Sequence, residues 1–454
     1  MLCLGQFVSL TGSALSGFAL GVWVYERTQS ITKFGLVVFC GLLPNIVISP
    51  MAGVLVDRID RRRVMIFSDL GASLITLGLA LLLMANRLEI WHICICLALC
   101  SMLGAFRTLA FTVSMSLLVP KQHFGRAFGM LQLAEATSLV IAPTLAGLLV
   151  VTMAMHNLLL IDFASFIFSL VLLLFIAIPQ PHQTEEPAAH NRSLISEFTF
   201  GWRYIRVRSG LLGLLLLYAC FNINTSAVQM LIQPLVLRLA SPVVLGTVLS
   251  VAATGLLLGS AVMSAWGGPK PRIKGVLGFN LVQAVSIILA GFYLSLPVVA
   301  AAIFLISASF PMINSCSQAI WQAKVAPEVQ GRVFATRRML SMLFVPVAYL
   351  GTGPLADHVF EPLMDVNGAL ASSVGRVVGV GPNRGIGLLF MLLGIMMVMQ
   401  VVAGYLHPRI RKVEDELPDA VPSELPVKAK EETLDVLISQ PVFEHGETAQ
   451  PSDT

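Results

Sequence analysis

Twelve apolar stretches follow one another along this chain, each close to the roughly 20 residues that cross a bilayer as a helix. Mean hydropathy is +0.83 and only 12% of the residues are charged, against about 25% in soluble domains. Backbone polar groups in hydrocarbon must pair within their own segment, so each stretch has to be helical. The sequence therefore predicts an all-α polytopic membrane protein with spans near 3–25, 34–56, 64–86, 90–112, 127–150, 157–178, 211–236, 243–266, 275–294, 297–319, 333–353 and 385–407.

The basic residues set the expected orientation. If both termini lie on one side, 22 Lys and Arg fall on that side and six on the other, with Arg107 left inside a span. Positive charge concentrates in cytoplasmic loops, so both termini are expected in the cytoplasm. Because the basic groups separate apolar runs and do not gather on one soluble surface, we expect no nucleic-acid partner.

Polar segments divide the chain into four parts. We expect a six-helix bundle over 1–178, a cytoplasmic linker over 179–210, a second bundle over 211–407 and a disordered acidic cytoplasmic tail over 408–454. In the linker, Phe198–Arg208 mixes aromatic and basic residues. This pattern is typical of an amphipathic helix lying on the inner leaflet, although an ordinary solvated linker is the alternative.

Two other segments carry expectations. Met1 lies almost within the first span without preceding basic residues, so we expect the natural chain to begin earlier or to be clipped. The outer segment near 354–384 is long and apolar, and we expect it to form an ordered cap.

A short internal repeat supports two equivalent bundles. The loops after the fourth and tenth spans each contain a Pro followed by Gly-Arg-x-Phe, at Gly125–Phe128 and Gly331–Phe334, 206 residues apart. The offset matches a repeat of six helices, as in transporters whose halves are related by an axis along the membrane normal. The sequence thus predicts a 6+6 architecture.

The loop between the second and third spans carries a motif. Gly53-x-Leu55-x-Asp57-Arg58-x-x-Arg61-Arg62 resembles the G-x-L-x-D-R-x-G-R-K/R loop of major facilitator superfamily transporters, with Asp60 in place of the second glycine. Further segments look like the macrolide-efflux and enterobactin-exporter branch of drug:proton antiporters: Gly5-Gln6-x-x-Ser9, Ala19-Leu20-x-x-Trp23-Val24-Tyr25, Leu43-Pro44 and Ile161-Asp162-x-x-Ser165-Phe166. The resemblance implies the major facilitator fold with pseudo-two-fold symmetry.

The motif suggests a gating latch. Asp57 ends the second span, where a carboxylate can oppose the positive end of a neighbouring helix dipole. The resemblance implies that this neighbour is the eleventh span, which begins after Gly331-Arg332. The alternative is that the arginines only anchor the topology. The proposed latch consists of Gly53, Asp57, Arg58, Arg61, Arg62, Gly331 and Arg332.

Ionisable residues inside spans are costly and usually functional. Glu135 lies about 12 Å into the fifth span at ~1.5 Å per residue, where it could take up a proton on one side and release it on the other. A neutral, hydrogen-bonded structural acid is the alternative. Asp69 and Asp162, near the ends of their spans, are further candidates for proton coupling or simple packing, and Arg107 is expected to snorkel from the inner end of its span.

The resemblance also places the first, fourth, seventh and tenth spans around a central cavity. A neutral, amide-lined cavity suits a bulky amphipathic compound, although each polar residue could equally bond between helices. Pro143 is expected to kink the fifth span. The cavity candidates are Gln6, Ser9, Asn222, Asn224, Gln229, Asn314 and Gln318.

These features predict a secondary transporter in the bacterial inner membrane. We expect a monomer that exports a macrolide-, siderophore- or peptide-like compound, driven by the proton gradient with no cofactor or metal. A lysophospholipid or lipid flippase of the same fold is the alternative. A membrane-embedded transferase is remote, because neither a metal-binding acidic cluster nor a catalytic histidine group is evident, and no catalytic residue is expected.

Removing the charge of Asp57 tests the latch. Asp57→Asn should insert normally but abolish export, because an amide opposes a helix dipole poorly. Arg63→Gln, the matched control, should remain active, since Arg63 serves only as an anchor. Export by membrane vesicles is the measurement, and a fully active Asp57→Asn protein would rule the latch out.

Overall fold

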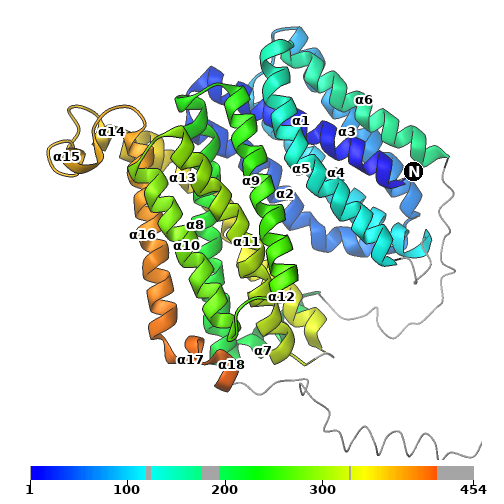
Figure 1. Cartoon of the computed structure of the whole chain (residues 1–454). Coiled ribbons are helices and arrows are strands. Elements are labelled where there is room, and N and C mark those ends of the chain that lie inside the picture. The colour runs from blue at the N-terminus through cyan, green and yellow to red at the C-terminus, as the bar shows by residue number, and fades with distance from the viewer. Residues whose placement is uncertain (1, 119–123, 176–193, 327–328, 417–454) are drawn as a thin grey trace, which may run out of the picture.

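A computed structural model describes residues 2–118, 124–175, 194–326 and 329–416 (Figure 1). No β-strand occurs in these ranges, and twelve helical segments within them are long and apolar enough to cross a membrane. The chain is therefore an all-α polytopic membrane protein, as the sequence predicts.

The first six spans are single helices. They are α1 (Leu2–Thr28), α2 (Ile31–Arg58), α3 (Arg61–Met84), α4 (Ile90–Leu118), α5 (Phe124–Thr152) and α6 (Met155–Leu174).

The second half begins with the short helix α7 (Leu194–Val207) and its last spans are less regular. The elements that follow are α8 (Ser209–Leu239), α9 (Pro242–Trp266), α10 (Arg272–Phe292), α11 (Leu296–Lys324), α12 (Gln330–Met342), α13 (Val345–Pro354), the π-helical turn η3 (Leu355–Phe360), α14 (Glu361–Met364), α15 (Gly375–Val378), α16 (Arg384–Leu406), α17 (Pro408–Arg411) and α18 (Val413–Glu416).

Helix pairing repeats between the halves. In the first half, α1 packs on α5 and α6, α3 on α4 and α6, and α2 on α4. The second half has the same pairs six spans later: α8 packs on α13 and α16, α10 on α11 and α16, and α9 on α11. These matching pairs confirm the 6+6 repeat that the sequence predicts, because each span occupies the same position in its own bundle.

The halves are joined at one end, which we call the joined face. This face carries the turns at 29–30, 153–154 and 240–241, and the ribbons diverge toward the opposite face, which carries the turn at 59–60 (Figure 1). Joining occurs along α5 with α9 and along α2 with α13. These two contacts are equivalent under the repeat, since each pairs the second helix of one half with the fifth of the other.

The α5–α9 contact depends on two glycines. A Cβ on Gly246 would lie 2.3 Å from the carbonyl oxygen of Pro143, and one on Gly147 would lie 2.5 Å from that of Pro242. Ser250 donates to the carbonyl of Val140 nearby. The backbones therefore approach closely enough that any larger residue at these glycines must separate the helices.

Polar side chains tie the halves together at the same face. Asp357 of η3 accepts hydrogen bonds from the Ser30 Oγ, the Thr32 backbone N–H and the Thr32 Oγ1, each at 2.9 Å. Asp357 thus caps the N-terminus of α2 from the other half. Arg238 of α8 pairs with Glu361 of α14 and donates to the Tyr25 hydroxyl of α1.

The structure differs from several expected boundaries. The eleventh span was expected to end near 353, but helix continues through η3 and α14 to Met364, so the outer segment is shorter than 354–384. The helix expected over Phe198–Arg208 is present as α7, which begins four residues earlier at Leu194, packs on α12 and α8 and buries Ile205. Residues from 408, expected to be disordered, begin with α17 and α18 and bury Ile410 and Val413. Residues 417–454 lie outside the described residues.

Gly246→Val should weaken the joined face. The added branch meets the backbone of Pro143, and overpacking of this kind costs about 1–3 kcal/mol. Distances between spin labels at Arg87→Cys and Val366→Cys, in a cysteine-free background, should lengthen or broaden. The matched control is Gly78→Val, where a Cβ meets nothing within 4 Å. An unchanged distance distribution for Gly246→Val would contradict this role.

Candidate functional site

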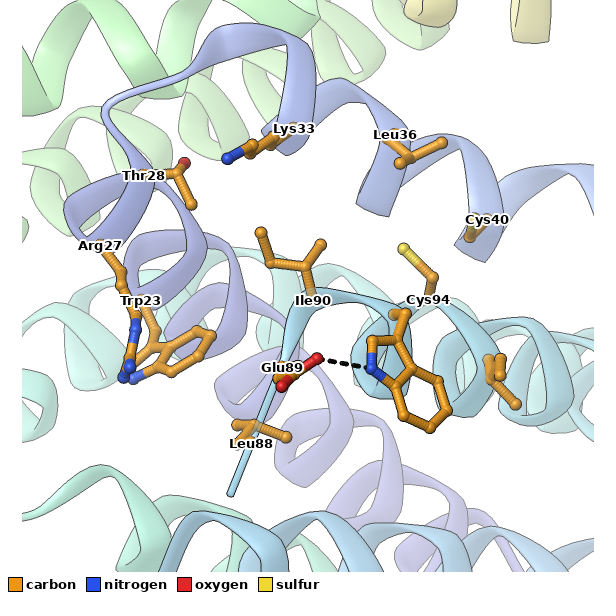
Figure 2. Close-up of a pocket in the computed structure, with 12 residues that line it drawn as sticks. Trp23, Arg27, Thr28, Lys33, Leu36, Cys40, Leu88, Glu89, Ile90 and Cys94 are labelled. Carbon is orange, nitrogen blue, oxygen red and sulfur yellow. Dashed lines mark hydrogen bonds between the residues drawn. The ribbon is translucent and has the colours of Figure 1, made fainter. Parts of the chain in front are cut away.

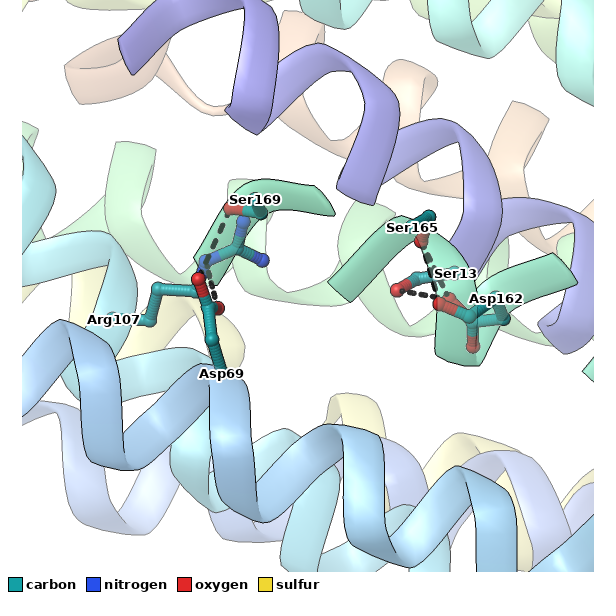
Figure 3. A network of polar contacts seen from close by, with 6 residues as sticks. All are labelled: Ser13, Asp69, Arg107, Asp162, Ser165 and Ser169. Atoms are coloured by element: carbon teal, nitrogen blue, oxygen red, sulfur yellow. Dashed lines mark hydrogen bonds and ion pairs between the residues drawn. The ribbon is translucent and has the colours of Figure 1, made fainter. Parts of the chain in front are cut away.

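A buried charged cluster lies inside the first half, between α1, α3, α4 and α6 (Figure 3). Arg107 Nε lies 2.8 Å from Asp69 Oδ1, and the two side chains are 10% and 1% exposed. Ser169 Oγ donates to the other oxygen of Asp69 at 3.0 Å. The guanidinium also lies over the ring of Phe166, 5.8 Å from its centroid. Asp69 and Arg107 therefore form a buried ion pair.

Asp162 occupies a different environment in the same bundle. Its carboxylate accepts from Ser16 Oγ at 2.6 Å and from Ser13 Oγ at 3.2 Å, while Ser165 Oγ lies 3.4 Å from Oδ1. In the described part of the chain no cation lies within ion-pair distance of it. Hydroxyls can donate to a carboxylate or accept from a carboxylic acid, so this environment satisfies either protonation state.

Small residues allow the helices to converge on Asp162. A Cβ on Gly12 of α1 would lie 2.2 Å from Ser165 Oγ and 3.0 Å from Asp162 Oδ1. The serines and this glycine lie on α1 and α6, which pack along each other. Gly12 therefore gives α1 the close approach that lets Ser13 and Ser16 reach the acid.

The depths of these charges differ from expectation. Asp162 lies seven residues after the start of α6 at Met155, and Asp69 eight residues after the start of α3 at Arg61, so both are about 11–12 Å from a helix end. Arg107 was expected to snorkel, which is wrong: it lies eleven residues before the end of α4 at Leu118 and pairs with Asp69. The ion pair could have been predicted from the sequence, because an arginine inside a membrane span needs a buried partner.

Glu135 lies apart from this cluster. It lies eleven residues after the start of α5 at Phe124, and its side chain is exposed. Pro143 lies further along α5, where its carbonyl contacts Gly246. Pro143 therefore lies at the α5–α9 contact between the halves.

The motif loop is partly described. Gly53, Asp57 and Arg58 lie on α2, but the structure describes neither the exposure of Gly53 nor the side chains of Asp57 and Arg58, so the latch stays a prediction. Asp60, the departure from the family motif, accepts from the Arg62 N–H at 2.9 Å and caps the start of α3. This cap gives a physical reason for an acid in place of glycine.

The remaining latch residues lie at helix starts. Arg61 and Arg62 open α3, and Arg62 Nη2 donates to the Leu174 carbonyl at 2.7 Å. Gly331 is exposed in the first turn of α12, and the neighbouring Arg332 lies over the ring of Phe200, 5.4 Å from its centroid.

The expected cavity residues separate into two groups. Gln6, Ser9 and Asn224 are 7%, 0% and 0% exposed, so they lie within their bundles. Asn224 donates to Gln400 Oε1 at 3.0 Å, and Asn222 to the Ser341 carbonyl at 3.1 Å. These bonds join neighbouring helices of the second half, which is the alternative role that the sequence left open.

Asn314, Gln318 and the exposed Gln229 are less enclosed, and Gln318 contacts the charged side chain of Arg337. Arg337 of α12 donates to Gln318 Oε1 and to Ser317 Oγ, both at 2.9 Å. Tyr218 donates to Asn314 and lies under the same guanidinium. Within the described ranges, Arg337 has no ion-pair partner. From the sequence, Arg337 serves only as a marker of orientation, and its contacts with Gln318 and Ser317 are not predicted.

The buried pair should respond strongly to single substitutions. Arg107→Met should lower the free energy of unfolding by about 3–5 kcal/mol because it leaves Asp69 charged and unpaired. Combining it with Asp69→Leu should restore much of that loss. Arg63→Met, the exposed control, should cost at most about 1 kcal/mol. Thermal unfolding in detergent is measured for the wild type, both single variants and the double variant. If the losses of stability in the two single variants simply add in the double variant, the pairing is contradicted.

Known proteins resemble this chain along most of its length. Macrolide efflux protein A of Streptococcus pyogenes is 27% identical over 363 residues, covering 78% of this chain and 88% of the relative. Multidrug efflux pump Tap of Mycolicibacterium fortuitum is 23% identical over 370 residues, covering 77% and 88%.

Solved structures show the same fold at low identity. A variant of the nucleoside transporter NupG superposes with a TM-score of 0.67 at 12% identity, covering 89% of this chain and 99% of that chain. A bacterial homologue of the human lysosomal transporter Spinster gives 0.62 at 14%, covering 88% and 93%.

The sequence model of the Major Facilitator Superfamily matches residues 2–348. The match covers most of both helical halves and agrees with the repeated helix pairing. The chain is therefore a transporter and not an enzyme, and it belongs to the Major Facilitator Superfamily.

Proposed function

We propose that this transporter exports a bulky amphipathic small molecule by alternating access coupled to protons. It would work as a single chain in the bacterial cytoplasmic membrane. The buried cluster around Asp162 carries the proposal, because it holds an acid that can be satisfied with or without a proton.

The charge balance of the cluster supports a proton-binding role. Asp69 and Asp162 contribute two acids and Arg107 one guanidinium, so the cluster is neutral when one acid is protonated. A net charge within the membrane is costly, and taking up a proton removes it. Asp69 is engaged by Arg107, which leaves Asp162 as the group that would exchange the proton.

The arrangement of the halves supports alternating access. The positive-inside distribution favours the cytoplasm for the diverging face and the outside for the joined face. The structure would then be inward-facing. Export requires the opposite arrangement as well, in which the joined face separates and the motif loop closes against α12.

The substrate class follows from the less enclosed polar residues and from the relatives. Asn314, Gln318 and Gln229 supply uncharged amides, and Arg337 adds one positive charge beside Gln318. Relatives named for macrolide and multidrug efflux favour large, mostly apolar compounds. A siderophore- or peptide-like compound would also fit, because it could place a polar group near Arg337.

Everted membrane vesicles test the proposal with a macrolide as the first probe. Wild-type vesicles should accumulate the compound when a proton gradient is imposed and release it when an uncoupler is added. Asp162→Asn should reduce gradient-driven accumulation to background, because the amide keeps hydrogen bonds to Ser13 and Ser16 but cannot carry a proton.

Asp365→Asn is the matched control, since Asp365 is an exposed acid outside the cluster. It should transport as the wild type does. Gradient-independent transport by the wild type would reject proton coupling, and full activity of Asp162→Asn would reject this acid as the carrier.

A further inference from the structure

A pocket of about 790 Å³ opens in the first half at the joined face (Figure 2). It lies between the end of α1, the start of α2 and the start of α4. It is separate from the buried cluster, and none of the latch or expected cavity residues lines it. The function proposed above leaves this pocket unused.

One end of the pocket is basic. Arg27 and Lys33 line it, both exposed, at the end of one span and the start of the next. Neither has an ion-pair partner in the described ranges. Glu89 also lines the pocket, and its carboxylate accepts a hydrogen bond from Trp91 Nε1 at 2.7 Å (Figure 2). The lining thus carries two cations against one carboxylate, and this net positive charge favours an anionic group.

The other end of the pocket is apolar and reaches into the membrane. Leu36 and Cys40 lie five and nine residues after the start of α2, or about 8 and 14 Å deep at ~1.5 Å per residue. Ile95 lies opposite on α4, and it and Leu36 are 50% and 41% exposed. This wall offers apolar surface at the depth of lipid chains.

Two tryptophans mark the depth of the boundary. Trp23 and Trp91 both line the pocket, and Arg27 lies over the ring of Trp23, 5.1 Å from its centroid. Tryptophan is enriched where headgroups meet chains, since its ring is apolar and its N–H is polar. Along the pocket, basic side chains are followed by indole rings and then by aliphatic side chains. A phospholipid has the matching order of charged headgroup, polar–apolar boundary and acyl chains.

We propose that this pocket binds an anionic phospholipid from the leaflet at the joined face. The phosphate of its headgroup contacts Arg27 and Lys33, and one acyl chain lies along Leu36 and Ile95. Basic side chains near a membrane surface each attract anionic lipid by about 1 kcal/mol. A zwitterionic lipid fits less well, because its ammonium group would face the same two cations.

The bound headgroup would lie beside the joint between the halves. Lys33 follows Thr32, whose backbone N–H donates to Asp357 of the other half. A lipid that binds the joined arrangement better than other arrangements stabilises it by mass action. Anionic lipid is thus expected to raise the thermal stability of the purified protein.

Native mass spectrometry of the full chain, released from nanodiscs, measures the binding directly. With equal phosphatidylglycerol and phosphatidylcholine, the wild type should retain phosphatidylglycerol preferentially. Arg27→Gln/Lys33→Gln should lower that retention about tenfold or more, since two favourable charges are removed. Leu36→Trp should lower retention of both lipids, because the larger ring fills the apolar end.

The matched control is Arg87→Gln/Arg376→Gln. It removes the same charge from exposed positions on the joined face that do not line the pocket. It should retain phosphatidylglycerol and gain thermal stability from it as the wild type does. Equal losses in both double variants would indicate only surface attraction and overturn the proposal, as would wild-type retention by Leu36→Trp. Displacement of the lipid by a free amphiphilic carboxylate would assign the pocket to a soluble ligand and also overturn it.

Discussion

The cost of an unpaired polar group in hydrocarbon organises this protein. It forces each span to be helical and confines most charges to span ends. It also explains the buried charges: Asp69 has Arg107 and Ser169 as partners, and Asp162 has serine hydroxyls. The charged residues in the interior of the first half therefore lie where neighbouring helices supply a counter-charge or hydroxyl groups. The same cost makes this interior the natural place for a group whose charge changes.

A second constraint is that the two halves meet through equivalent helices. The joint uses α5 with α9 and α2 with α13, and at its polar edge Asp357 caps the start of α2. The motif residue Asp57 lies near the other end of α2, which runs from Ile31 to Arg58. If the predicted latch forms, the two ends of this helix would be paired in opposite arrangements of the halves. Such a helix can favour one arrangement or the other according to which end is paired.

Much of the fold could be predicted from the sequence, because the length of an apolar stretch and the position of a charge are local properties of the chain. The spans and the 6+6 repeat were predicted from hydropathy and from the Gly331–Phe334 match, and the structure confirms both. The end of the eleventh span was misplaced because polar residues such as Asp357 and Glu361 interrupt its hydropathy while the helix continues. These residues are tolerated in the helix because Ser30, Thr32 and Arg238 of distant segments bind them.

The sequence by itself determined the class of protein, the number of spans and the list of ionisable residues within them. It did not determine which of those residues pair. Arg107 and Asp69 are 38 positions apart, and Asp162 meets Ser16 across 146 positions, so only the packing of α1, α3, α4 and α6 brings them together. The pocket between Arg27, Lys33 and Ile95 likewise exists only once α1, α2 and α4 are placed. Hydropathy is a property of each segment, whereas a polar site is a property of the distances between segments, and these are decided by tertiary structure.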